Sequence, residues 1–199
     1  MPRAAKFHKV GEPLNVQQVD VPEPGKNEVL VRVRCASICH SDVHVTTGVL
    51  LAKPPVTLGH EIAGDVEQVG SEVHNAKKGD RVVVYFLTPC GDCDACLRGM
   101  SAICRNINAG PMYGFSADGG YADYITVDST QLVHLPQNVS YEFGASLGCA
   151  GITAFHAVNA VANVGLGDRV AVYGTGGVGM YVLQLAKLSG ASTTIAIGR

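Results

Sequence analysis

The chain has 199 residues, of which 47% are hydrophobic and 16% charged, and its formal net charge is −2. This composition is typical of a globular protein with a core, and the small net charge gives no reason to expect nucleic acid as a partner. The N-terminal residues lack the apolar run of a signal peptide, and we expect no apolar stretch long enough to span a membrane. The prediction is therefore a cytoplasmic protein without a membrane or nucleic acid partner.

Short apolar runs separated by Gly and Pro turns fill about the first 140 residues. The clearest run is 28–34, in which Val29, Val31 and Val33 alternate onto one face of a strand. Further strand-like runs lie at 61–69, 80–87, 121–127 and 131–135. Together they predict an all-β or barrel-like region.

The pattern changes after residue 141, because 142–161 is rich in Ala and Gly with few turn signals and is typical of a helix. An apolar strand at 170–173 then leads into a glycine turn, a helix at 178–188 and a second strand at 193–197. This order predicts a βαβ unit. The fold class expected is an α+β part followed by an α/β part.

The glycine turn has the spacing Gly174-x-Gly176-x-x-Gly179, between a strand and a helix. In that context it predicts a dinucleotide site, because the glycines allow a tight turn and a close approach of the pyrophosphate to the helix N-terminus. Gly177 and Val178 complete the turn and are assigned to the same site. The alternative is a glycine-rich connector that binds nothing.

The identity of the dinucleotide depends on the end of the second strand. An acidic residue that would bind the ribose 2′-hydroxyl of NAD is absent there, and Arg199 follows Gly198 instead. A guanidinium can clamp a 2′-phosphate with two hydrogen bonds, so the pattern favours NADP over NAD. The alternative is that Arg199 is a solvated strand end.

Four of the seven cysteines stand close together, at Cys90, Cys93, Cys96 and Cys104. This spacing can wrap a tetrahedral metal ion, and four thiolates would close the site against chemistry. Cysteines so near in sequence are too cramped for unstrained disulfides among themselves, and a reducing location disfavours such bonds. An iron–sulfur cluster is a further alternative, although the last spacing does not fit the ferredoxin pattern.

Three separate motifs carry a second set of candidate ligands. Cys39 begins Cys-His-Ser-Asp-Val-His, His60 lies in Gly-His-Glu, and Cys149 lies in Leu-Gly-Cys-Ala-Gly-Ile. Two thiolates and one imidazole suit a zinc ion with one position left open. Taken singly, His60 would more often be a structural histidine and Cys149 a buried thiol.

These motifs, together with Gly-Gly-Tyr-Ala-Asp-Tyr at 119–124 and the glycine turn, resemble those of zinc-dependent alcohol dehydrogenases of the medium-chain dehydrogenase/reductase superfamily along the whole chain. The Cys₂His set is itself the known ligand set of alcohol dehydrogenase, so that assignment is a match to the family. The resemblance implies a GroES-like β-rich catalytic domain over 1–150. It also implies that 151–199 starts a Rossmann NAD(P)-binding domain, truncated after its first βαβ unit.

The resemblance further implies two zinc ions per chain. The structural ion would be bound by Cys90, Cys93, Cys96 and Cys104, and the catalytic ion by Cys39, His60 and Cys149, with Glu61 able to replace the open ligand transiently. By the same resemblance, Ser41 contacts the substrate oxygen and passes a proton toward His44, and His40 reaches the cofactor pyrophosphate. Asp42 and Glu61 would orient the ligands.

The function implied is hydride transfer between an alcohol and NAD(P)+ to give an aldehyde or ketone, in an enzyme that forms a homo-oligomer in its full-length form. A polyol, threonine or formaldehyde dehydrogenase of the same superfamily is the alternative. Zinc-free quinone reductases are disfavoured because all three ligand positions are filled. Outside enzymes, a non-catalytic zinc-stabilised fragment is the competing hypothesis. The apolar helix at 178–188 would need more cover than two strands give, so we expect an N-terminal portion of a longer enzyme.

Overall fold

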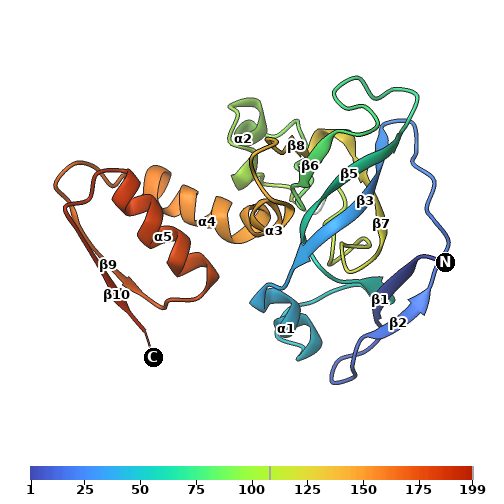
Figure 1. Cartoon of the computed structure of the whole chain (residues 1–199), viewed down its shortest axis with the longest axis horizontal. Helices are drawn as coiled ribbons and strands as arrows, with labels where there is room; N and C mark the ends of the chain where they lie inside the picture. Colours follow the sequence, from blue (N-terminus) through green and yellow to red (C-terminus); the bar gives the residue numbers. More distant parts are fainter. Residues whose placement is uncertain (108, 199) are drawn as a thin grey trace. The chain divides into compact units, whose positions relative to one another are not determined.

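The computed structural model describes residues 1–107 and 109–198. Within it the chain divides into two units, Met1–Gly148 and Cys149–Arg199. The elements of both units are labelled in Figure 1.

A five-stranded antiparallel sheet forms the centre of the first unit, in the strand order β7-β3-β5-β6-β8. Its strands are β3 (Glu28–Ser37), β5 (Glu61–Val69), β6 (Arg81–Val84), β7 (Tyr124–Asp128) and β8 (Leu132–His134). The five strand-like runs predicted from the sequence each overlap one of these strands, and the run at 61–69 has the same bounds as β5.

Three predicted strands, β6, β7 and β8, are shorter in the structure, and for the first two the reason lies in their hydrogen-bond partners. The last residue of β6, Val84, pairs with Ile62 of β5. Because β5 begins at Glu61, only one residue before Ile62, residues 85–87 have no strand of β5 to pair with. β7 starts late because the N–H of Tyr121 donates to the carbonyl of Leu58 instead of joining the sheet. Strand ends are thus decided by the neighbouring strand rather than by local sequence.

The core of this sheet follows the alternation expected from the sequence. Val29 and Val31 of β3 are fully buried, and Val33 packs against the same cluster. The other buried members come from neighbouring strands and one loop: Ile62, Val66, Val82, Val84, Tyr113, Ile125 and Val127. Burying each such aliphatic side chain contributes about 1.5–3 kcal/mol relative to leaving it in water, so this cluster positions the strands that carry the site.

A second, three-stranded sheet was not expected from the sequence. It has the order β2-β1-β4 and consists of β1 (Arg3–Phe7), β2 (Asn15–Gln18) and β4 (Val56–Thr57). These strands are short, and β2 is largely exposed, so they carry little apolar alternation for a sequence pattern to detect. The short helix α1 (His40–Thr46) was missed for the same reason, since it has few buried residues.

A close backbone approach at Gly64 in β5 gives a test of this sheet. A Cβ atom there would lie 2.2 Å from the carbonyl oxygen of Arg32 on β3, so Gly64→Ala must push the two central strands apart. We expect a loss of about 3 kcal/mol or more in the free energy of unfolding, measured by urea titration. Gly165→Ala, at a position with open space around it, is the control and should change stability by less than about 0.5 kcal/mol. Equal effects of the two substitutions would contradict the sheet described here.

The predicted helix at 142–161 is present as a continuous helical segment that changes type along its length. It runs through α3 (Tyr141–Ser146), η3 (Leu147–Gly151), α4 (Ile152–Phe155) and η4 (His156–Val161), of which η3 and η4 are π-helical. Ser140 caps its start by accepting a hydrogen bond from the N–H of Phe143. π-helical turns occur mostly as short insertions and often lie at functional sites.

The same segment corrects one expectation. Tyr141–Val161 has 21 residues and contains an 18-residue window with a mean hydropathy of 1.2, so by length and composition alone it qualifies as a membrane-spanning candidate. The expectation that no apolar stretch reaches this length was therefore wrong. The core helix of a soluble protein meets the same criterion, because only length and apolar composition are tested.

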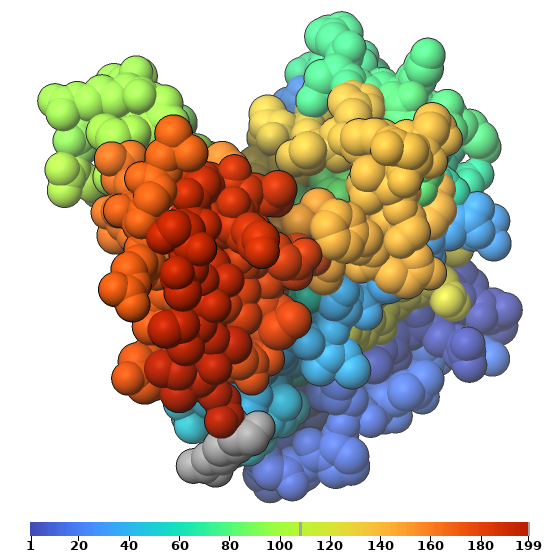
Figure 2. Space-filling model, turned by 60° about the vertical axis from the view of Figure 1, so that its left-hand side comes forward, coloured from blue at the N-terminus to red at the C-terminus, as the bar shows by residue number. Residues whose placement is uncertain are grey.

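The second unit contains the predicted βαβ arrangement. Strands β9 (Arg169–Tyr173) and β10 (Thr193–Ile197) pair in parallel and are connected through α5 (Gly177–Leu188). Figure 2 shows α5 and β10, in red, on the surface of this unit. Apolar side chains on both elements are exposed, among them Val178, Met180, Ile195 and Ile197.

The first unit also contains three short helices: α2 (Asp94–Leu97), η1 (Ser101–Ile103) and η2 (Ser129–Gln131).

Candidate metal centres and dinucleotide turn

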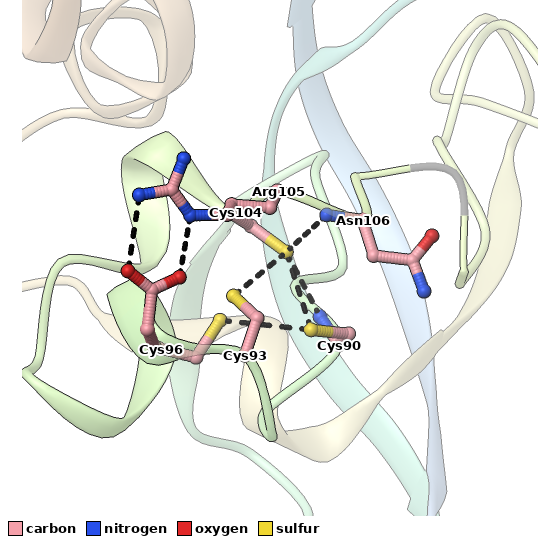
Figure 3. A network of polar contacts seen from close by, with 7 residues as sticks. Cys90, Cys93, Cys96, Cys104, Arg105 and Asn106 are labelled. Carbon is pink, nitrogen blue, oxygen red and sulfur yellow. Dashed lines mark hydrogen bonds and ion pairs between the residues drawn. The ribbon is translucent and has the colours of Figure 1, made fainter.

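The four clustered cysteines converge in a loop region, residues 90–104, that we call the lobe (Figure 3). The Sγ atom of Cys104 lies 3.4 Å from that of Cys90 and 4.0 Å from that of Cys93. The Sγ atoms of Cys90 and Cys96 are 3.9 Å apart. All four Sγ atoms lie within 4.8 Å of one another.

These sulfur separations fit a tetrahedral zinc ion. A Zn–S bond of about 2.3 Å places neighbouring sulfurs about 3.8 Å apart, whereas a disulfide would bring them to about 2.05 Å. Two backbone N–H groups, of Cys90 and Asn106, donate to Cys104 Sγ at 3.4 Å each, as Figure 3 shows. The N–H groups of Cys96 and Arg105 lower the pKa of Cys93 to about 6, which favours the thiolate that a metal binds.

An ion pair outside the cluster braces the lobe. The Arg105 guanidinium donates from Nε and from one terminal nitrogen to the two carboxylate oxygens of Asp94, the first residue of α2. Both side chains are substantially exposed, so water and salt screen the pair and it adds little to stability. The cysteines therefore remain the main connection between the two ends of the lobe.

The second candidate centre is assembled by the register between β3 and β5. Ser37, the last residue of β3, pairs with Glu61, the first residue of β5. Cys39 follows Ser37 by two residues and His60 precedes Glu61, so this pairing brings the two motifs together. Cys149 lies in the helical segment η3 one residue after Gly148, the last residue of the first unit.

The ligand atoms of Cys39, His60 and Glu61, all in the first unit, lie within 4.8 Å of one another. His60 and Glu61 are buried, and Cys39 and Cys149 are half-buried. A thiol, an imidazole and a carboxylate so close together belong to the donor set that zinc binds in proteins. Within the first unit the structure thus brings together three of the four residues that the sequence predicted for this site, and Cys149 is the first residue of the second unit.

The carboxylate of Asp42 contacts residues of both motifs. Its Oδ2 accepts a hydrogen bond from the N–H of Cys39 at 3.0 Å. Its Oδ1 accepts one from the N–H of Gly59 at 3.3 Å and lies 3.4 Å from His60 Nδ1. The last contact is an ion-pair distance rather than a well-aligned hydrogen bond, so Nδ1 is a buried nitrogen without a hydrogen-bond partner.

The electrostatics of this cluster favour a cation. Burial opposes charge on the imidazole, but the Asp42 carboxylate and the Cys39 thiol raise the pKa of His60 to about 9. Burial likewise raises the pKa of Asp42, yet His60, Tyr121 and the N–H of Cys39 hold it below its usual value. The buried carboxylate of Asp42 therefore favours a positive charge at this cluster.

The other predicted site residues of the first unit lie on α1. Ser41 Oγ is 3.6 Å from Cys39 Sγ. The rings of His40 and His44, one turn apart, meet edge to face with centroids 4.7 Å apart. The structure therefore places Ser41 beside a ligand and the two histidines beside each other, while a proton path from Ser41 to His44 stays a prediction.

The glycine turn connects β9 with α5 as predicted. Gly174 has φ +93, a conformation that glycine adopts without strain. A Cβ at Gly179 would lie 1.9 Å from the Gly174 carbonyl oxygen, so this position accepts only glycine. Open space surrounds Gly176, which precedes the helix start at Gly177 and Val178. Arg199, on which the preference for NADP depends, lies outside the described residues.

Sequence reasoning assigned no role to Tyr121, which the structure places next to this centre. Its hydroxyl donates to Asp42 Oδ2 at 2.8 Å. The residue belongs to the motif at 119–124, but its partner Asp42 is 79 positions away. In the sequence, Tyr121 is marked only by the two glycines before it, and His60 by the glycine before it. Neither feature identifies the contact between Tyr121 and Asp42.

Residues 25–137 match the family described as the alcohol dehydrogenase GroES-like domain, and the chain belongs to this family. An alcohol dehydrogenase from Geobacillus stearothermophilus is 40% identical over 192 residues, covering 94% of this chain and 56% of that protein. This result confirms the predicted family and fold class.

Solved structures agree. The thermostable alcohol dehydrogenase from Pyrobaculum aerophilum with bound cobalt and zinc has a TM-score of 0.91 and 37% identity, covering 100% of this chain and 60% of that one. A zinc-binding dehydrogenase structure from Sinorhizobium meliloti 1021 bound to NADP has a TM-score of 0.90 and 35% identity, covering 98% of this chain and 56% of that one. The chain spans 56% to 60% of the length of these three relatives.

Proposed function

We propose that the chain belongs to an NAD(P)-dependent alcohol dehydrogenase, an oxidoreductase that interconverts an alcohol and an aldehyde or ketone. The observation that carries this proposal is the clustering of Cys39, His60 and Glu61 within 4.8 Å in the first unit, with Cys149 as the first residue of the second unit. Four thiolates around one zinc ion leave no position for a substrate. Two thiolates and one imidazole leave the fourth position on the ion open to a substrate. Family membership supports the same function.

Two zinc ions per chain are part of the proposal. Cys39, His60 and Cys149 would hold the catalytic ion, with Glu61 as a transient ligand, and the lobe cysteines would hold the structural ion. Zinc at the first site supplies Lewis acidity and the dinucleotide supplies the hydride acceptor. The relatives with zinc and with NADP bound support this assignment.

The remaining roles fall to side chains of the chain itself. Ser41, placed beside Cys39, would contact the substrate hydroxyl and take up its proton, and His44 would carry that proton toward solvent. Asp42 would orient His60 and hold the backbone of Cys39. His40 and the turn from Gly174 to Gly179 would bind the pyrophosphate at the start of α5.

We assign the GroES-like catalytic domain to residues 1–150 and the start of the Rossmann domain to 151–199. NADP is favoured over NAD because Arg199 follows Gly198 where a carboxylate would select NAD. The relative with bound NADP supports this choice.

We propose a small-molecule alcohol as the substrate. The full-length protein would be a cytoplasmic homo-oligomer with no nucleic acid or membrane partner. The segment Tyr141–Val161 is then a helix of a soluble protein, because it carries the candidate ligand Cys149 and the charged Glu142. The net charge of −2 supports the absence of a nucleic acid partner.

The test is to measure zinc per chain and alcohol-dependent reduction of NAD+ and NADP+ on the metal-replete protein. We expect two zinc ions and faster reduction of NADP+. A single zinc ion per chain that survives Cys39→Ser would overturn the catalytic site. Two zinc ions with dinucleotide binding but no alcohol-dependent reduction would instead favour a non-catalytic zinc-stabilised protein.

A further inference from the structure

We propose that Tyr121 is a positioning residue of the Cys39–His60 centre, which it serves by fixing the carboxylate of Asp42. The inference rests on the proposed function, since it assigns a role around the same metal site. Tyr121, Asp42, Cys39 and His60 all lie in the first unit, so the argument uses contacts within that unit.

The contacts of Asp42 show what Tyr121 adds. Oδ2 receives two hydrogen bonds, from the N–H of Cys39 at 3.0 Å and from the Tyr121 hydroxyl at 2.8 Å. Oδ1 faces the N–H of Gly59 and the Nδ1 of His60. The terminal torsion of an aspartate has broad minima, so donors on both oxygens are needed to fix its plane. The tyrosine supplies the shorter of the two bonds on Oδ2.

Burial makes this bond consequential. The Asp42 side chain is 6% exposed, so water cannot replace a missing donor easily. A buried carboxylate that loses a hydrogen bond must either rotate or keep an oxygen lone pair without a hydrogen-bond donor. Rotation would move Oδ1 away from His60 Nδ1, to which it is only loosely aligned already.

The orientation of Asp42 decides which nitrogen of His60 is available. The imidazole ring packs against Phe86 and Phe115, with ring centroids 4.9 Å apart in both pairs. These rings limit the plane of the imidazole but offer it no polar partner. A carboxylate at Nδ1 keeps the proton there, which leaves the lone pair of Nε2 for a metal ion.

The backbone around Tyr121 is arranged to hold its ring at this place. Its N–H donates to the carbonyl of Leu58 at 2.9 Å, and the N–H of Gly120 donates to the carbonyl of Gly59 at 2.7 Å. Gly59 has φ +89, and a Cβ there would lie 2.5 Å from Cδ1 of Tyr121. The residue before His60 therefore lacks a side chain where the tyrosine ring lies, which is an observation independent of the hydroxyl bond.

The experiment removes only the hydroxyl, with Tyr121→Phe. Zinc release to a chelator is followed in time, and the visible absorption spectrum of cobalt-substituted protein is recorded. We expect the affinity of one metal site to fall by about 10- to 100-fold and its cobalt spectrum to change. The lobe metal should be retained as in the unsubstituted protein.

Tyr113→Phe is the matched control. Tyr113 is buried in the first unit, whereas Tyr121 is half-buried, and the Tyr113 hydroxyl accepts a hydrogen bond from the N–H of Asp128 at 2.8 Å, away from Asp42. Its loss should lower the thermal midpoint without changing either metal site. Metal loss of equal size in both variants would mean that Tyr121 acts only through general stability and would overturn the proposal.

A double-mutant cycle tests the route of the effect. If Tyr121 acts through the carboxylate, Tyr121→Phe should cause little further metal loss in an Asp42→Asn background. Additive losses would overturn the proposal. Failure of the proposed function is distinguishable, because the unsubstituted protein would then bind a single zinc ion that Cys39→Ser leaves in place. Two tightly held zinc ions in Tyr121→Phe would overturn only the role of Tyr121.

Discussion

Replacing Cys104 by serine is expected to release one zinc ion per chain and to unfold the lobe at residues 90–104. Cys104 is the buried member of the four cysteines, and its sulfur contacts those of Cys90 and Cys93. A serine hydroxyl binds zinc more weakly than a thiolate does, and its oxygen reaches less far from the backbone than a cysteine sulfur. The tetrahedral site would therefore lose one of its four metal–ligand bonds.

The effect should be large because the lobe has little else to hold it. Its helices α2 and η1 have four and three residues, too short to be stable alone. Its larger apolar side chains point to solvent, since Leu97 is 75% and Ile103 56% exposed. Structural zinc contributes about 10–16 kcal/mol of apparent binding free energy in small zinc domains, so we expect the lobe to depend on the proposed metal for its fold.

Zinc content and limited proteolysis measure the result. We expect cleavage within the lobe to become about tenfold faster or more, while the five-stranded sheet stays folded because the lobe contributes no residue to its core. Cys35→Ser, at a half-buried cysteine outside both clusters, should keep both zinc ions. A Cys104→Ser protein with full zinc content and an intact lobe would show that the four cysteines do not hold a structural metal.

Replacing Cys39 by serine is expected to remove the other zinc ion and to abolish turnover while the fold persists. In the proposed enzyme, zinc held by Cys39 would supply Lewis acidity worth several kcal/mol, so kcat/KM should fall by about 10³-fold or more on its loss. The backbone N–H of residue 39 that donates to Asp42 is unchanged by this substitution, so Asp42 keeps that contact. The thermal midpoint should therefore change little compared with Cys104→Ser.

The two serine variants form a contrasting pair, and each is measured by zinc content, thermal midpoint and alcohol-dependent reduction of NADP+. Cys104→Ser should lose stability and one zinc ion, whereas Cys39→Ser should lose activity and the other. Retention of activity in Cys39→Ser would contradict the catalytic assignment. Loss of the same zinc ion in both variants would mean that only one of the two centres binds metal.

Local patterns in the sequence predicted the central elements well. The run at 61–69 matches β5, and the second strand at 193–197 matches β10, because alternation or apolar content is strong in both. β1, β2 and α1 were missed, since short elements with few buried residues carry weak patterns. The expectation that no apolar stretch is long enough to span a membrane was wrong for Tyr141–Val161, although the bounds of this helical segment were predicted to within one residue.

The candidate ligands could be named from the sequence because the chemistry of a thiolate or imidazole depends on residue type and spacing. The lobe cysteines and the glycine turn are each contained in one short stretch, so their spacing already predicts their geometry. Tyr121 had no such signal, because a phenol hydroxyl acquires a role only through its partner.

What the sequence determined by itself is therefore the local chemistry: four thiols that can surround an ion, a turn that only glycine can make, and a family resemblance. The tertiary structure decided which distant groups meet. The pairing of Ser37 with Glu61 brings Cys39 to His60, and the Leu58–Tyr121 hydrogen bond brings a phenol to Asp42. These contacts join residues far apart in the chain, and strand register, which depends on the whole sheet, is the physical factor that selects them.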